Sequence, residues 1–461
     1  MIFNSLPFVG FLAVVVLVYY LPPARRWQVE WLVLTSLFFY AWEQPALLSL
    51  LLISATITSA ASYAILKGAE PRLAATLGVV ANLSILAFFK YNHLVAASLG
   101  AQIGQIGSLG QALLLLPLPV GISFYTFHGI SLVVDAWRGK VPKAEPFGPA
   151  RHYRNTLLYI IFFPQLVAGP IVKAADFMPQ IGWKKFGDVD WRTVFHYTVV
   201  GYFLKVVIAD NLAQQTSFIA CPACQNLSSV DLAVLLIGYS VQIFADFCGY
   251  SSIAIGIAAL LGYRLPINFN RPYLADSIAD FWRRWHISLS SFLREYLYIP
   301  LGGNRRGPVR TYANLIIVMG LGGLWHGAAW SYAVWGLWHG VGLAVERACG
   351  GSEPTSRSLV LRAFRIACVF AFVTLGWLLF KLPNFADALE YLSAMVTNTH
   401  IRPSLLRCLV IAAYALPVFA YHLLPSRRFG TVRRQMAVEG LLLGAIILNS
   451  GSSNAFIYFQ F

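Results

Sequence analysis

The sequence predicts an all-α polytopic membrane protein with about ten to twelve transmembrane helices, accompanied by re-entrant or interfacial helices. Of its 461 residues, 58% are hydrophobic and only 11% are charged, and apolar stretches recur almost to the end of the chain. Soluble domains carry about 25% charged residues, so this chain lacks the polar side chains needed to cover a water-exposed surface. Helices are expected because the strands of a β-barrel would show as short alternating segments.

The apolar stretches justify this interpretation element by element. A full span needs about 20 residues, and several stretches are shorter, which indicates tilted, re-entrant or half-helices covered by protein or lining a cavity. No soluble domain interrupts the series and no domain-sized repeat is evident, so a single transmembrane domain is expected over residues 1–461. The stretches lie near residues 8–21, 31–42, 45–66, 74–89, 113–134, 155–171, 194–208, 232–261, 313–324, 329–345, 359–380, 406–424 and 436–448.

Basic residues predict the orientation of these helices. The net charge is +15, and in a membrane protein an excess of Lys and Arg marks cytoplasmic loops, so nucleic acid is not an expected partner. No charged side chain precedes Arg25 and Arg26, which follow the first apolar run, whereas a cleavable signal peptide carries its charge before that run. The N-terminus is therefore expected outside, with Arg25–Arg26 and the basic interval 138–154 on the cytoplasmic side.

The longest polar-rich interval, residues 263–310, carries eight arginines against three acidic residues. This asymmetry predicts a cytoplasmic location. The interval is also rich in Trp, Tyr and Phe, which together with arginine indicates helices lying in the membrane interface. Its charged residues are Arg264, Arg271, Arg283, Arg284, Arg294, Arg305, Arg306, Arg310, Asp276, Asp280 and Glu295.

Motifs of several other protein classes are absent. The sequence contains no His-Glu-x-x-His, no Gly-x-Ser-x-Gly and no P-loop, which argues against zinc proteases, serine hydrolases and ATP-driven pumps. Cys221 and Cys224 form a Cys-Pro-Ala-Cys pair in a polar loop, without a nearby Cys or His pair to complete a zinc site. A local disulfide or an unreactive pair is expected there, and no bound metal.

Three polar residues recur inside the apolar stretch 232–261. Gln242, Asp246 and Tyr250 are spaced four residues apart and share one face of a helix. An acid at membrane depth must face the protein interior or a cavity and find a partner there. The three side chains are either a polar wall of an internal path or, equally, Asp246 is a structural residue hydrogen-bonded to a Tyr or an Arg.

Two copies of Trp-His-Gly carry His326 and His339 in one of the most apolar parts of the chain. The run 313–324 before His326 would cover about 18 Å as a helix, which places this histidine well into the bilayer. Gly320, Gly322, Gly323 and Gly327 surround it and allow close approach by backbone or ligand. A functional role is therefore favoured for His326, whereas His339, in a smoother helical run, is expected to be a packing residue.

His286 is a third candidate, within Trp-Arg-Arg-Trp-His beside Arg283 and Arg284. A neutral imidazole accepts a proton near pH 7, and neighbouring positive charges favour that neutral form. The alternative for the arginines is ordinary anchoring at the cytoplasmic membrane face.

With these residues in view, the chain resembles the membrane-bound O-acyltransferase (MBOAT) family, and more narrowly its bacterial alginate O-acetyltransferase-like members. The matching blocks occur in order from the first third of the chain to the aromatic C-terminus, and together they are specific. They are LPVGISFYTFHGISLVVDAWRG (118–139), FFPQLVAGPIV (162–172), LKVVIADNLA (204–213), FADFCGYSSIAIGIAALLGY (244–263), FWRRWHISLSSFLREYLYIPLGGNRRG (281–307), LGGLWHGAAWSYAVWGLWHG (321–340) and IYFQF (457–461).

The resemblance implies roles for individual residues and a ring of helices around a central tunnel. The catalytic histidine of the family matches His326, its second histidine matches His286, and His339 matches a position without a catalytic role. The implied donor is acetyl-CoA from the cytoplasm, with no bound cofactor. The donor's phosphates would be held by arginines at the cytoplasmic mouth, for which the candidates are Arg283, Arg284, Arg305 and Arg306.

The resemblance also implies acetylation of an extracytoplasmic polysaccharide by an enzyme of the bacterial inner membrane. It further implies a separate periplasmic esterase-like (SGNH) transferase as partner. The aromatic tail (Phe456, Tyr458, Phe459, Phe461) is expected to dock at the outer mouth or on that partner; anchoring of a last helical turn is the alternative. Two other functions remain open: transfer of D-alanine or another acyl group to an envelope polymer, and transport of a polysaccharide or lipid without acyl chemistry.

Overall fold

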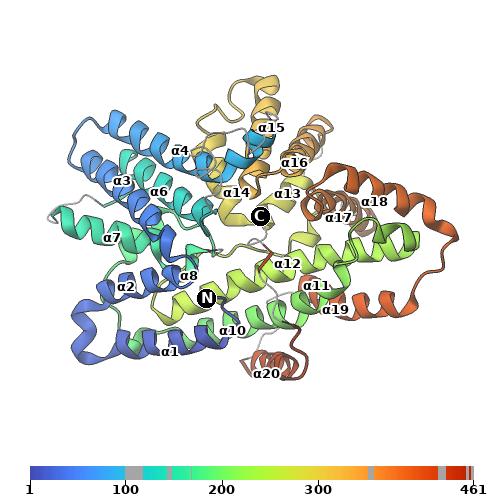
Figure 1. The fold of residues 1–461 in the computed structure, drawn as a ribbon, viewed down its shortest axis with the longest axis horizontal. Helices are drawn as coiled ribbons and strands as arrows, with labels where there is room; N and C mark the ends of the chain where they lie inside the picture. Colours follow the sequence, from blue (N-terminus) through green and yellow to red (C-terminus); the bar gives the residue numbers. More distant parts are fainter. Residues whose placement is uncertain are drawn as a thin grey trace. The chain divides into compact units, whose positions relative to one another are not determined.

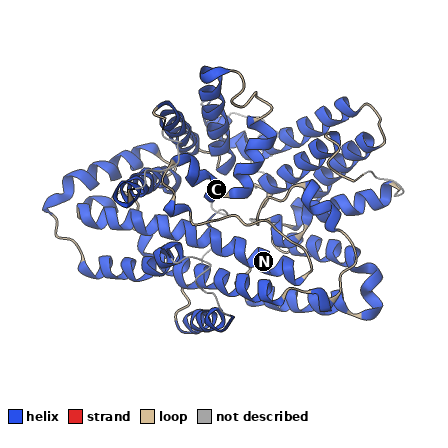
Figure 2. Ribbon diagram, turned by 180° about the vertical axis from the view of Figure 1, so that it is seen from behind, coloured by secondary structure: helices blue, strands red, loops and turns tan. Residues whose placement is uncertain are grey.

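The computed structural model describes residues 1–98, 118–142, 148–167, 169–350, 358–423, 432–452 and 456–457. In this part of the chain, helices joined by turns and loops form the whole structure, and no strand occurs (Figure 2). The helices belong to two compact units, which we describe separately. Unit 1 comprises Met1–Phe195 and Ala254–Pro266, and unit 2 comprises His196–Ile253 and Ile267–Phe461.

The helices of unit 1 run from blue to teal in Figure 1. Between α1 and α2 lies a 3₁₀ turn, and the pair bends there by 96°. These helices are α1 (Leu6–Tyr20), α2 (Gln28–Ala41), α3 (Leu48–Leu66), α4 (Pro71–Ser98), α6 (Ile122–Trp137), α7 (Pro149–Ile161), α8 (Phe163–Leu166) and α9 (Ala174–Phe177).

Unit 2 contains most of the remaining helices, including two short π-helical segments, Phe203–Ala209 and Arg294–Tyr298. Two helices cross the boundary between the units in sequence, α10 and α12. The helices are α10 (Trp191–Tyr202), α11 (Asp210–Thr216), α12 (Ser229–Leu260), α13 (Ile278–Arg284), α14 (Ile287–Leu293), α15 (Gly307–His326), α16 (Trp330–Ala348), α17 (Leu359–Lys381), α18 (Phe385–Thr397), α19 (Leu405–Leu423) and α20 (Val432–Leu448).

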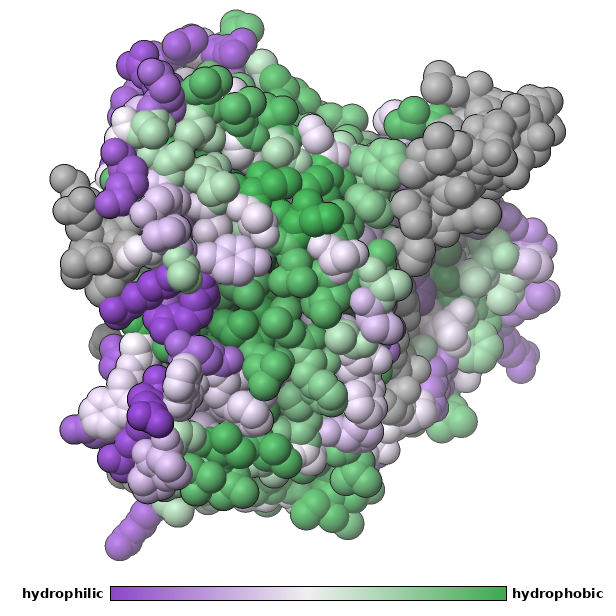
Figure 3. Space-filling model, turned by 60° about the vertical axis from the view of Figure 1, so that its left-hand side comes forward, coloured by the Kyte–Doolittle hydropathy of each residue, from purple (hydrophilic) through white to green (hydrophobic). Residues whose placement is uncertain are grey.

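Six described helical segments are long and apolar enough to cross a membrane, or seven if the bent pair α1–α2 is one span. The expected ten to twelve spans would also have to include α15 and α16, which are 20 and 19 residues long but less apolar. Figure 3 shows a broad area of hydrophobic side chains bordered by hydrophilic ones on one face, as a lipid-exposed surface requires. The chain is thus an all-α multi-pass membrane protein.

Two apolar stretches differ from the expected continuous spans. Stretch 155–171 is interrupted, because Pro164 cannot continue α7, which ends at Ile161, and α8 follows as a single turn. Stretch 113–134 becomes α6, which begins at Ile122 after the left-handed Gly121, and the part before residue 118 lies outside the described residues.

The helices of unit 1 are joined by polar contacts at membrane depth. Asn82 on α4 donates to Thr58 Oγ1 at 3.1 Å and accepts from Ser54 Oγ at 2.9 Å, both on α3. On α6, a Cβ at Gly129 would lie 2.8 Å from Thr58 Oγ1, so the glycine lets this helix approach. Small residues and interhelical hydrogen bonds commonly stabilise the association of helices in a membrane.

In unit 2, α15 and α16 are packed backbone to backbone. A Cβ on Gly323 would collide with the Tyr332 carbonyl oxygen, and one on Gly336 would collide with the Met319 carbonyl oxygen. The two glycines therefore fix how closely α15 approaches α16. Because α15 ends at His326, this contact also fixes the position of that histidine.

We predict that Gly323→Ala destabilises unit 2, whereas Gly320→Ala does not. At Gly323 the added methyl group meets fixed backbone, which costs roughly 1–3 kcal/mol in overpacking. At Gly320 the nearest atom to a new Cβ is Leu337 Cδ2 at 3.4 Å, an ordinary contact. The midpoint of thermal unfolding of the purified protein in detergent checks this, and equal midpoints for the two variants would contradict the packing described.

Candidate active site

The structure brings two of the predicted histidines together. His326 is the last residue of α15, and His286 lies between α13 and α14 with a left-handed backbone (φ 43°). Their ring centroids are 6.3 Å apart, and both side chains are buried. Segments about forty residues apart in sequence therefore place two imidazoles within reach of one substrate group.

Aromatic side chains surround the histidine pair. The His286 ring meets the edge of Phe247 on α12 at 4.6 Å between centroids. The His326 ring lies 5.2 Å from Trp335 and 5.4 Å from Phe380. These aromatic walls are apolar, and an apolar environment strengthens the electrostatic interactions at the pair.

A hydrogen-bond network orients His286. Asn268 Oδ1 accepts from the Ser288 backbone N–H at 3.3 Å and lies 3.3 Å from His286 Nδ1, while Asn268 Nδ2 donates to Ser251 Oγ at 3.0 Å. Since the Ser288 N–H can only donate, the amide oxygen must face His286. His286 Nδ1 therefore carries the hydrogen, and Nε2 holds a lone pair; Nε2 has no hydrogen-bond partner among the described residues.

Burial keeps His286 neutral. Removal from solvent lowers the pKa of its imidazole to about 3. The neighbouring arginines, expected from sequence to have this effect, are not among its causes: the Arg283 side chain is 67% exposed, and Arg284 Nε pairs with Asp280 at 2.7 Å. At physiological pH the ring is therefore neutral, and its unprotonated nitrogen can accept a hydrogen bond.

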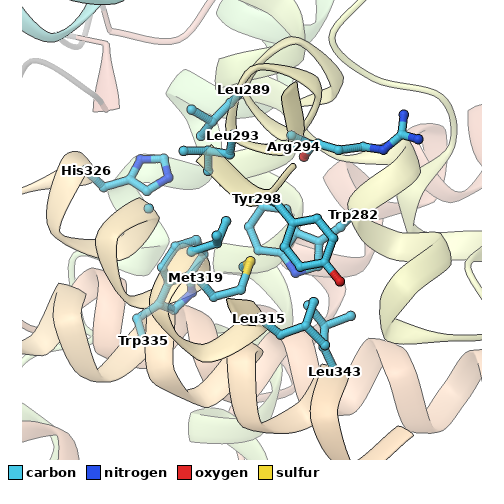
Figure 4. Close-up of a pocket in the computed structure, with 13 residues that line it drawn as sticks. Trp282, Leu289, Leu293, Arg294, Tyr298, Leu315, Met319, His326, Trp335 and Leu343 are labelled. Atoms are coloured by element: carbon cyan, nitrogen blue, oxygen red, sulfur yellow. The ribbon is translucent and has the colours of Figure 1, made fainter. Parts of the chain in front are cut away.

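A cavity of about 240 Å³ in unit 2 ends at His326. Figure 4 shows His326 at one side and Arg294 at the other, with Leu293 and Met319 between them. The lining is almost entirely apolar. Its residues are Trp282, Leu289, Ser290, Leu293, Arg294, Tyr298, Leu315, Val318, Met319, Gly322, His326, Trp335 and Leu343.

Arg294 is the arginine that lines this cavity, and the sequence alone did not distinguish it from the other arginines. It begins the π-helical segment that also supplies Tyr298. The arginines proposed for phosphate binding, Arg283, Arg284, Arg305 and Arg306, do not line this cavity, and Arg305 and Arg306 are exposed. Their role in donor binding stays a prediction.

His339 lies in an aromatic core. Its ring stacks on Phe281, meets Trp335 at 4.9 Å, and has no hydrogen-bond partner on either nitrogen among the described residues. Gly376 on α17 makes room for it, since a Cβ there would lie 3.3 Å from His339 Nε2. This environment agrees with a packing role.

On the polar face of α12, Asp246 and Tyr250 are buried and Gln242 is half-buried, and the three side chains make separate contacts. Asp246 Oδ1 pairs with Lys205 Nζ at 2.8 Å, and Lys205 also pairs with Asp210 at 2.8 Å. Gln242 accepts from Thr216, and the Tyr250 ring stacks on Phe456. The partner of Asp246 is thus Lys205 and not the expected Tyr or Arg, and the internal path along this face stays a prediction. The sequence interpretation missed Lys205, although it lies in a quoted block.

Part of the C-terminal tail is anchored at the same place. The Ile457 backbone N–H donates to Asp246 Oδ2 at 2.7 Å, and the Phe456 ring lies 5.9 Å from that of Phe247, which contacts His286. The other aromatic residues of the tail, Tyr458, Phe459 and Phe461, lie outside the described residues. Docking of the tail at an outer mouth or on a partner stays a prediction.

The described residues offer one potential metal-binding cluster, Cys221, Cys224 and Glu390. Its two cysteines are joined in a disulfide, as one of the sequence alternatives had it. A disulfide provides no thiolate ligands, so this cluster does not fit a metal ion.

The sequence of this chain is similar to those of known proteins. The model of the membrane-bound O-acyltransferase family matches residues 150–386. A peptidoglycan O-acetyltransferase of Helicobacter pylori is 34% identical, over 94% of this chain and 91% of its own length. A probable alginate O-acetylase AlgI of Pseudomonas aeruginosa is 38% identical, over 86% and 75%. A teichoic acid D-alanyltransferase of Bacillus subtilis is 32% identical, over 48% and 57%.

The family match covers α7 to the start of α18 and therefore includes both histidines and the cavity. With the relatives that align along most of the chain, it establishes the class of the enzyme. The chain belongs to the membrane-bound O-acyltransferase family and is a multi-pass membrane acyltransferase.

Proposed function

We propose that this enzyme moves an acetyl group from cytoplasmic acetyl-CoA to a hydroxyl group of an extracytoplasmic polysaccharide, with His326 as general base. The observation that carries the proposal is the buried histidine pair at the end of an apolar cavity with an arginine at its other side. Acyl transfer from a thioester to an alcohol needs a proton acceptor next to the carbonyl carbon and a water-free site that prevents hydrolysis.

The cavity suits the donor's thioester arm. An acyl-CoA combines a long, weakly polar arm with anionic phosphates, and the cavity combines an apolar lining with Arg294. Arg294 is solvent-exposed, so its guanidinium would hold phosphate oxygens while the arm extends inward to His326. The exposed Arg283, Arg305 and Arg306 and the half-buried Arg284 would add attraction for the anionic donor at longer range.

The reaction needs no acyl-enzyme intermediate. His326 removes the proton from the acceptor hydroxyl as its oxygen attacks the thioester carbonyl carbon. The tetrahedral intermediate then collapses with cleavage of the C–S bond, and the departing thiolate takes the proton from His326. The products are the acetyl ester and free CoA.

The hydrogen bonding of His286 restricts its part in this reaction. Stabilising an oxyanion would require a hydrogen on Nε2, and Asn268 holds that hydrogen on Nδ1. The Nε2 lone pair can instead accept a hydrogen bond from a second hydroxyl group of the acceptor sugar, which would help to aim the reacting oxygen at the carbonyl. Backbone N–H groups would then stabilise the oxyanion.

The relatives favour acetyl as the acyl group. The two that align along most of the chain are named for O-acetyl transfer, to peptidoglycan and to alginate. The D-alanyltransferase aligns over about half of this chain, so D-alanyl transfer is the second candidate. Membership of an acyltransferase family argues against a transporter without acyl chemistry.

We further propose a periplasmic SGNH-type transferase as partner, the inner membrane as location, and an outside N-terminus.

We predict that His326→Ala abolishes acetylation of envelope or secreted polysaccharide, while His339→Ala retains most of it. Loss of the base removes a contribution of about 10²–10⁴-fold, whereas His339 contacts only packing residues. Acetate released by alkali, at matched amounts of each variant in the membrane, checks this. Equal acetate from all three strains would contradict acetyl transfer, and loss in both variants would contradict the different roles of the histidines.

We predict that Asn268→Leu and Asn268→Asp affect turnover differently. Leucine removes the acceptor for His286 Nδ1–H, which costs about 1–3 kcal/mol, or roughly ten- to hundredfold in kcat. Aspartate keeps an acceptor but stabilises the imidazolium, so it raises the pKa of His286 from about 3. Activity should then survive at alkaline pH and fall as the pH is lowered through the raised pKa.

The measurement is kcat and KM for the donor against pH, with Ser251→Ala as the control that leaves Asn268 Oδ1 in place. If Asn268 had a structural role alone, kcat would fall by the same factor in both Asn268 variants at every pH. Such identical profiles would contradict the positioning of His286 by Asn268.

A further inference from the structure

A second cavity, of about 400 Å³, lies wholly within unit 1, and nothing in the proposed reaction uses it. Three segments form its walls: the turn between α1 and α2 with the start of α2, the first turns of α7, and the loop at residues 181–183. Its lining residues are Arg25, Arg26, Gln28, Val29, Glu30, Arg151, Arg154, Ile181, Gly182 and Trp183.

The lining is strongly cationic. Four guanidinium groups face one carboxylate, that of Glu30, and this carboxylate already pairs with Arg154 Nη1 at 2.6 Å. Arg154 is further held by Asn155 Oδ1, which accepts from Nε at 3.1 Å and from Nη2 at 2.9 Å. Like charges gathered around one hollow repel one another, and an anion placed among them relieves that repulsion.

The walls are held together by a buried side chain. Gln28, only 2% exposed, donates to the Tyr19 and Lys184 carbonyl oxygens at 2.9 and 3.0 Å. Its Oε1 accepts from the Lys184 N–H at 2.8 Å. These hydrogen bonds connect the start of α2 to the 181–184 loop. The backbone of the fold therefore defines this cavity.

Two helix ends add to the positive potential. Val29 and Glu30 belong to the first turn of α2, and Arg151 to that of α7, and neither helix has a side-chain cap at its N-terminus. The helix macrodipoles leave partial positive charge at these ends. Exposed Trp183 flanks the hollow and lies against the Arg25 guanidinium at 5.8 Å, a combination typical of the membrane interface.

We propose that this cavity binds a phosphate group carried by an anionic phospholipid of the cytoplasmic leaflet. Arginine forks match phosphate oxygens, and both Arg25–Arg26 and the 138–154 interval are predicted to be cytoplasmic from the positive-inside pattern. A soluble phosphate shares this chemistry, and the interfacial tryptophan favours the lipid as its source. The inference does not depend on the proposed acyl donor or acceptor.

The test is the thermal unfolding midpoint of the full chain in nanodiscs of phosphatidylcholine, with and without phosphatidylglycerol. A ligand that binds the folded state raises this midpoint, and we expect a rise of about 2 °C or more. The rise should be lost in the double variant Arg25→Gln, Arg151→Gln and retained in Arg72→Gln. Arg72 is an exposed arginine of the same unit on α4 and lies outside the cavity.

A second variant keeps the proposal testable if the double variant misfolds. Glu30→Gln removes the carboxylate that occupies Arg154, so it should enlarge the rise produced by phosphatidylglycerol. Inorganic phosphate added to phosphatidylcholine discs separates the sources, because a rise there would assign the cavity to a soluble phosphate. Equal rises in the wild type, the double variant and Glu30→Gln would overturn the proposal, since general attraction of the membrane surface would then explain them.

Discussion

The close contact of α15 with α16 at Gly323 and Gly336 is the constraint on which the active site depends. It leaves no room for a side chain between the two backbones, so α15 can end only where His326 faces Trp335 and Phe380. The same contact brings Met319 and Gly322 to the cavity wall. Helix packing, and not a flexible loop, therefore sets the distance between the proposed base and the rest of the site.

Burial in apolar surroundings then determines which polar groups each element must supply. His286 is fully buried, and Asn268 Oδ1 accepts its Nδ1 hydrogen. Asp246 is compensated by Lys205 and by the Ile457 N–H. An unpaired buried charge would cost several kcal/mol, so each of these polar residues requires its partner. The consequence for function is that the neutral His286, with a defined tautomer, lies next to His326, which lines the apolar cavity.

The membrane fold and the histidines were predictable from the sequence, and their partners were not. Composition and apolar stretches predict helices, and glycines around His326 favour it over His339. Arg294, however, looks like the seven other arginines of residues 263–310, and only its place in a π-helical turn directs it to the cavity. Asn268 and Lys205 bond to residues distant in sequence, which no local pattern reveals. The break at Pro164 within an apolar stretch was readable locally but was not used.

In the proposed reaction, acetyl passes from cytoplasmic acetyl-CoA across the membrane by way of His326. Inside-out membrane vesicles containing this enzyme, its partner and its polymer test it directly, when acetyl-CoA labelled in the acetyl group is added outside. The account predicts alkali-labile label on polymer in the lumen with the wild type, and none with His326→Gln at the same membrane level. Equal label with both enzymes would contradict it.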